Sequence, residues 1–61
     1  MKRIRVEYCG EWYDVVYTLT DDDVLKLVSI SDGNLLTTDK SCFNKELIIH
    51  IEATIIANEV I

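Results

Sequence analysis

The chain has 61 residues, of which 49% are apolar and 28% charged, with two glycines, no proline and a formal net charge of −5. This composition indicates a globular protein rather than a disordered one, and the length predicts one small domain over residues 1–61. Polar residues interrupt each apolar run well before the ~20 residues that a membrane span requires, and no apolar signal core follows the start, so we expect a cytoplasmic protein without membrane association.

The first nineteen residues predict a β-hairpin. Apolar and polar side chains alternate from Arg3 to Tyr8 and again from Trp12 to Leu19, and the glycine of Cys9-Gly10-Glu11 suits a short turn between the two runs. One face of the hairpin is then apolar, with the residues Ile4, Val6, Tyr8, Tyr13, Val15, Tyr17 and Leu19. The other face carries Arg3, Arg5, Glu7, Trp12, Asp14, Val16 and Thr18.

The next segment allows two interpretations. Thr20 followed by three aspartates resembles a helix start, and Asp32-Gly33-Asn34 resembles a helix stop, which together predict a helix over residues 21–31. The alternative is a strand over residues 25–31 that enters a hairpin through Asp32-Gly33. Residues 34–45 are mostly polar and predict a connection with three core anchors, Leu35, Leu36 and Phe43.

The tail favours a strand. From Glu46 to Ile55 the residues alternate between apolar and polar with one exception, Ile48, and isoleucine and threonine favour strands. A helix over the same residues would be apolar on two opposed faces. We therefore expect an α+β fold in which a three-stranded antiparallel sheet, made of the hairpin and a C-terminal strand over residues 46–57, carries one helix. The alternative is four strands followed by a C-terminal helix.

The sequence contains no catalytic, cofactor or metal motif. His50 is the one histidine, no serine or cysteine stands in a nucleophile motif, and the two glycines are too far apart for a phosphate loop. Three adjacent aspartates point in different directions and lack the spacing of a calcium loop. Cys9 and Cys42 are too isolated for a redox or zinc motif, and we expect two reduced thiols. We expect no enzyme activity and no cofactor.

The expected function is therefore protein binding. Trp12 and Val16 share the outward hairpin face with Arg3 and Arg5, and tryptophan and arginine are enriched at binding hot spots. Ile48, from the predicted tail strand, completes this set. We expect a small acidic inhibitor or adaptor that binds a protein partner, as a homodimer whose contacts include the apolar residues of the tail that the core leaves over: Ile48, Ile56, Ala57, Val60 and Ile61.

A nucleic-acid-binding regulator is the alternative function. It would use Lys2 and the two arginines of the N-terminal strand, which make up half of the six basic residues of the chain. From Val6 onward, eleven acidic residues stand against three basic ones. Because phosphate binding requires a basic surface, this balance argues against nucleic acid as the partner.

Overall fold

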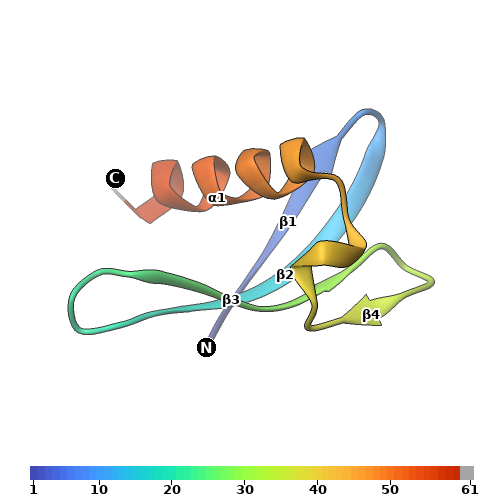
Figure 1. Cartoon of the computed structure of the whole chain (residues 1–61). Helices are drawn as coiled ribbons and strands as arrows, with labels where there is room; N and C mark the ends of the chain where they lie inside the picture. The colour runs from blue at the N-terminus through green and yellow to red at the C-terminus, as the bar shows by residue number, and fades with distance from the viewer. Residues whose placement is uncertain (60–61) are drawn as a thin grey trace.

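The computed structural model describes residues 1–59 and shows an α+β fold, as expected, with four antiparallel strands in the order β1-β2-β3-β4 and one helix across one face of the sheet (Figure 1). The elements are β1 Lys2–Tyr8, β2 Glu11–Leu19, β3 Leu25–Ser31, β4 Leu36–Thr37, a 3-10 turn Lys40–Cys42 and α1 Lys45–Glu59. The alternative of four strands and a C-terminal helix is confirmed, and the three-stranded arrangement is wrong. Expectations for Val60 and Ile61 lie outside the described residues.

The first hairpin forms as predicted. Strands β1 and β2 pair from Lys2↔Tyr17 to Tyr8↔Glu11, which leaves a two-residue loop. The φ angles of both loop residues are positive, 52° at Cys9 and 82° at Gly10. These are the angles of a type I′ turn, whose twist matches that of the flanking strands, and glycine adopts them without steric cost.

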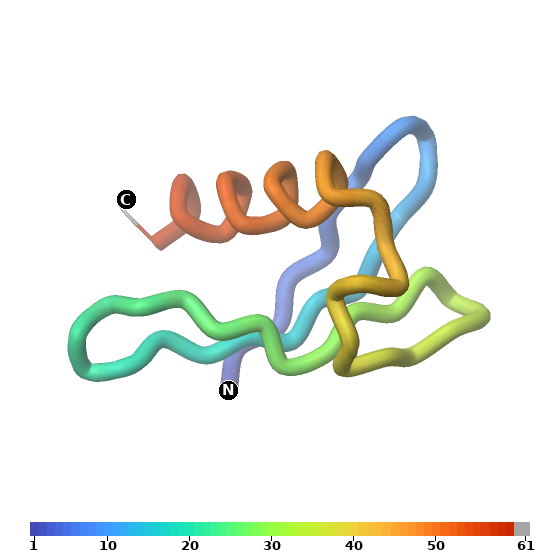
Figure 2. Tube along the Cα trace, viewed as in Figure 1, coloured from blue at the N-terminus to red at the C-terminus, as the bar shows by residue number. Residues whose placement is uncertain are grey.

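Residues 21–31 do not form the expected helix. Strand β3 pairs with β2 from Leu19↔Leu25 onward, and residues 20–24 form the loop of a second hairpin (Figure 2). The Thr20 hydroxyl does accept a backbone N–H, but it accepts that of Val24 at 3.1 Å, inside this loop. Asp23 has a φ of 60°, which aspartate tolerates better than most residues. The capping signals are thus used by a turn, because pairing with β2 satisfies the backbone of β3.

A bulge keeps the correct face of β3 toward the core. The register shifts between Val16 and Tyr17, so that Leu27 pairs with Tyr17 and Ser29 pairs with Val16, with Val28 as the extra residue. Strict alternation from Leu27 onward would put Ser29 on the core side of the sheet and turn Ile30 to the opposite side. The extra residue restores Ile30 to the core, where its side chain is 2% exposed.

The turn after β3 is organised by Asp32. Its carboxylate accepts the backbone N–H groups of Asn34 at 2.9 Å and Leu35 at 2.8 Å, and these bonds lower the pKa of Asp32. The chain then enters β4, where Leu36 pairs with Ser31. The expectation of three core anchors is correct for Phe43, which packs against the core, but Leu35 and Leu36 are exposed.

The predicted tail strand is also wrong, because Lys45–Glu59 form α1. The Asn44 side chain accepts the backbone N–H of Glu46 at 2.7 Å and so caps the helix start. Leu47, Ile51 and Ile55 are buried against the sheet. These residues are four apart, and a helix places such residues on one face.

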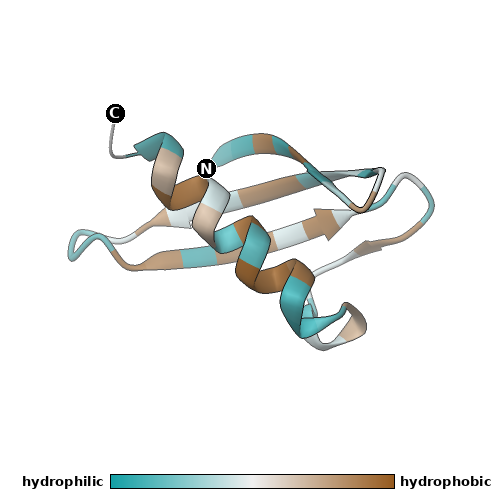
Figure 3. Ribbon diagram, turned by 90° about the horizontal axis from the view of Figure 1, so that it is seen from above, coloured by the Kyte–Doolittle hydropathy of each residue, from teal (hydrophilic) through white to brown (hydrophobic). Residues whose placement is uncertain are grey.

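The core lies between α1 and the sheet and contains one apolar face of each. The helix crosses the strands diagonally when viewed from its own side (Figure 3). The buried residues are Val6, Val15, Tyr17, Ile30, Leu47, Ile51 and Ile55. The predicted apolar face of the hairpin supplies three of these residues and four partly buried neighbours, Ile4, Tyr8, Tyr13 and Leu19.

Candidate protein-binding face

The face of the sheet opposite α1 is not covered by any described residue, and we call it the open face. Its membership follows from strand register: residues that pair across the sheet share a side, and core residues mark the other side. The open face comprises Arg3, Arg5, Glu7, Trp12, Asp14, Val16, Thr18, Lys26, Ser29, Ser31 and Leu36.

The structure brings together four of the five residues predicted for protein binding. Arg3, Arg5, Trp12 and Val16 lie on the open face, and Arg3 pairs directly with Val16. Ile48 does not join them. It lies on α1, on the opposite side of the sheet, and packs against the core. Its predicted place depended on a tail strand that does not form.

Trp12 is the largest apolar group on this face and is 54% exposed. The guanidinium carbon of Arg5 lies 5.2 Å from the centre of its ring, which is cation–π geometry. Arg5 also forms an ion pair with Asp14, with 3.4 Å between Nε and Oδ1. An exposed pair of this kind contributes only about 0–1 kcal/mol to stability. Its consequence is positional, because it holds the arginine above the indole.

Leu36 is a site residue that the sequence interpretation missed. It is 71% exposed and follows Arg5, Asp14 and Ser31 in one row of paired residues across the sheet. The signal that could have found it is the Asp32-Gly33 turn, because pairing through this turn sets Leu36 opposite Ser31. The row thus runs from Arg5, which lies over Trp12, to the apolar side chain of Leu36.

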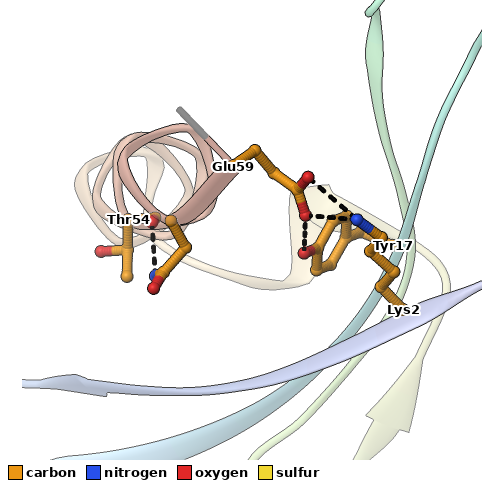
Figure 4. A network of polar contacts seen from close by, with 5 residues as sticks. Lys2, Tyr17, Thr54 and Glu59 are labelled. Carbon is orange, nitrogen blue, oxygen red and sulfur yellow. Dashed lines mark hydrogen bonds and ion pairs between the residues drawn. The ribbon is translucent and has the colours of Figure 1, made fainter. Parts of the chain in front are cut away.

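The N-terminal basic cluster is divided between the two sides of the sheet. Lys2 lies on the helix side, where its Nζ is 2.9 Å from both carboxylate oxygens of Glu59, and the Tyr17 hydroxyl donates to the same carboxylate at 2.7 Å (Figure 4). The hydrogen bond from Tyr17, together with Lys2, lowers the pKa of Glu59, and it raises the pKa of Tyr17. Only Arg3 and Arg5 remain on the open face.

His50 has a structural contact rather than a place in a reactive cluster. Its Nε2 lies 2.9 Å from the backbone oxygen of Glu7 on β1, and its ring is tilted against that of Tyr8. A hydrogen bond there requires the tautomer with a proton on Nε2. Because β1 is an edge strand, this contact covers part of an unpaired strand edge.

Other candidate chemistry is dispersed. Both cysteines are exposed and unbonded to each other. Among residues 1–59, no three histidine, cysteine, aspartate or glutamate side chains are grouped closely enough to hold a metal ion. No helix in the same range is long and apolar enough to cross a membrane.

An open cleft of about 370 Å³ lies between the β2–β3 hairpin and the last turns of α1. Its lining is Leu19, Asp23, Leu25, Ile55, Ile56 and Glu59. The carboxylate of Glu59 is already engaged by Tyr17 and Lys2.

Comparison with known proteins identifies no relative: no protein-family model, no curated protein and no solved structure matches this chain.

Proposed function

We propose that this chain is a small acidic protein-binding module of the cytoplasm, an inhibitor or adaptor, which occupies the surface of a partner protein and acts as a homodimer. The observation that carries the proposal is the half-exposed Trp12 held under Arg5 on an uncovered sheet face. Exposed aromatic and arginine side chains that are already positioned lose little entropy on binding, which is why they dominate many interfaces.

The apolar content of the open face supports a contact of useful strength. An aromatic side chain buries about 150–250 Å² in an interface, so a half-exposed tryptophan offers on the order of 100 Å². At roughly 25 cal/mol per Å², burial of that area contributes about 2.5 kcal/mol, or nearly a hundredfold in affinity. Val16, on the same strand as Trp12, and Leu36, on β4, add smaller areas.

The charges of the open face indicate the chemistry of the partner. Arg3, Arg5 and Lys26 stand there against Glu7 and Asp14, so the face is close to neutral although the whole chain is acidic. A complementary surface would offer an apolar pocket for the indole and a carboxylate or carbonyl for Arg3. The acidic excess lies on other surfaces, where it favours solubility.

The test compares three baits in affinity capture from the native host lysate, followed by calorimetry with the captured protein. Wild type and Trp12→Ala are compared with Val24→Ala, a control that is similarly exposed, at 57%, but lies at the β2–β3 turn. We expect Trp12→Ala to weaken binding about a hundredfold with no loss of thermal stability, and Val24→Ala to bind as wild type does. Equal binding by Trp12→Ala and wild type would refute the proposed face.

Nucleic-acid binding by Lys2, Arg3 and Arg5 has weaker support. Lys2 is paired with Glu59 on the other side of the sheet, and Arg5 is paired with Asp14. A phosphate-binding protein loses affinity steeply as salt rises. Fluorescence anisotropy with labelled DNA and RNA at low salt separates the two functions, because our proposal predicts no binding there, whereas salt-sensitive binding would favour the alternative.

A further inference from the structure

The outer surface of α1 carries a second apolar stripe that the core does not use. Ile49 is 63% and Ile56 53% exposed, and Ala53 and Ala57 are exposed between and beside them. We call these four residues the outer stripe. Their spacing of three and four places them on one face of the helix, opposite the buried face.

We propose that the outer stripe is the homodimer interface, in which two copies of α1 pack antiparallel about a two-fold axis between Glu52 and Ala53. This inference rests on the homodimer part of the proposed function and gives it a surface. The stripe is self-complementary, because Ile49 and Ile56 lie at equal distances on either side of this axis. The two-fold rotation therefore places Ile49 of each copy against Ile56 of the other copy. The small Ala53 side chain at the centre lets the helices approach closely.

Charge on one flank of the helix favours the antiparallel arrangement. Lys45, Glu52 and Glu59 are seven residues apart and therefore share a flank. In a two-fold antiparallel pair like flanks meet, so Lys45 comes level with the last helical turn of the second copy, which has no basic residue and carries the negative end of the helix dipole. The positive and negative helix ends also meet in this arrangement. Near the axis, Glu52 of one copy faces Glu52 of the other, which is the one like-charge contact on this flank.

The area of the stripe sets the strength of the dimer. From Ile49 to Ala57 the helix rises roughly 12 Å, and a strip of that length and one helix width is far smaller than the ~800 Å² per partner of a standard stable interface. We therefore expect a weak, reversible dimer with a dissociation constant on the order of 100 µM.

The sharpest test exploits the opposite effects expected of two flank variants. In sedimentation equilibrium, Ile49→Glu should weaken association at least tenfold and Lys45→Glu should also weaken it, whereas Glu52→Gln should strengthen it by removing the like charges at the axis. Leu35→Glu, at an exposed apolar site in the turn between β3 and β4, should leave association unchanged. Circular dichroism confirms that each variant folds.

Cross-linking provides a second measurement. With Cys9 and Cys42 changed to serine, Ala53→Cys should form a covalent dimer on oxidation, and Lys26→Cys, on the open face, should not. Wild type that stays monomeric up to about 1 mM, or a dimer that survives Ile49→Glu, would overturn the inference. A dimer that is lost in Trp12→Ala but kept in Ile49→Glu would place the dimer interface on the open face. The capture experiment is read separately, because loss of partner binding in Trp12→Ala does not depend on whether α1 dimerises.

Discussion

The sharpest prediction on stability compares two isoleucines that are two residues apart on α1. Ile51 is fully buried, at 0% exposed, and Ile49 is 63% exposed. Truncation of Ile51 to alanine removes three carbon atoms from the core, worth about 2.4 kcal/mol in transfer free energy, and leaves a cavity that brings the loss to about 3–4 kcal/mol. A 61-residue domain has a total stability of only about 3–9 kcal/mol.

Ile51→Ala should therefore lower the thermal midpoint by roughly 12–32 °C, or leave the protein partly unfolded at 25 °C. Ile49→Ala should change stability by no more than about 0.5 kcal/mol, because alanine favours helices more than isoleucine does. Thermal unfolding followed by circular dichroism measures both variants, at a few micromolar protein so that association does not contribute. In a C-terminal strand both side chains would face the core, so equal losses in the two variants would refute the helix.

Three further predictions concern the hairpins and the end of the helix. Because the Tyr17 hydrogen bond lowers the pKa of Glu59, its contribution to stability is complete above the unfolded value near 4.5 and is lost as pH falls through the folded pKa; acid should destabilise wild type more than Glu59→Gln, measured as thermal midpoint against pH. Gly10→Ala should cost about 1 kcal/mol in urea unfolding, because φ is +82° there and an added Cβ meets no neighbour, so that an unchanged midpoint would argue against the type I′ turn. Deletion of Val28 should remove the bulge and leave Ile30 in the core, because Ser29 then follows Leu27 directly and the pairs Val16↔Ser29 and Val15↔Ile30 are kept; in urea unfolding it should cost far less than Ile30→Ala, which truncates a buried side chain and should cost about 2–5 kcal/mol.

The first hairpin could be predicted completely because its signals are local. Alternation with period two assigns each side chain to a face, and a two-residue turn with glycine fixes the register between adjacent strands. The open-face positions of Arg3, Arg5, Trp12 and Val16 follow from the same rule. Leu36 could not be placed in this way, because its side depends on the register of β4 with β3.

The second hairpin shows what local chemistry leaves open. The hydroxyl of Thr20 and the carboxylate of Asp32 both accept backbone N–H groups, as their positions suggest. Both residues can perform this task at a helix end or in a turn. Whether residues 25–31 form a helix or a strand depends on β2, because its free edge pairs with them. A bulge is then needed to return Ile30 to the core. Neither feature is visible in the segment itself.

The tail was misassigned because its apolar residues satisfy two periods at once. Leu47, Ile51 and Ile55 are four apart and also an even number apart, so the same three residues fill the core in a helix or in a strand. The decisive residue is Ile49, which shares their face in a strand and lies opposite them in a helix. In the sequence, a helix over these residues would be apolar on two opposed faces, which argued against a helix. The helix α1 nevertheless has both of these faces. A chain of 61 residues can bury one of these faces against its single sheet, and the second face is the reason to expect that α1 also contacts another copy of the protein.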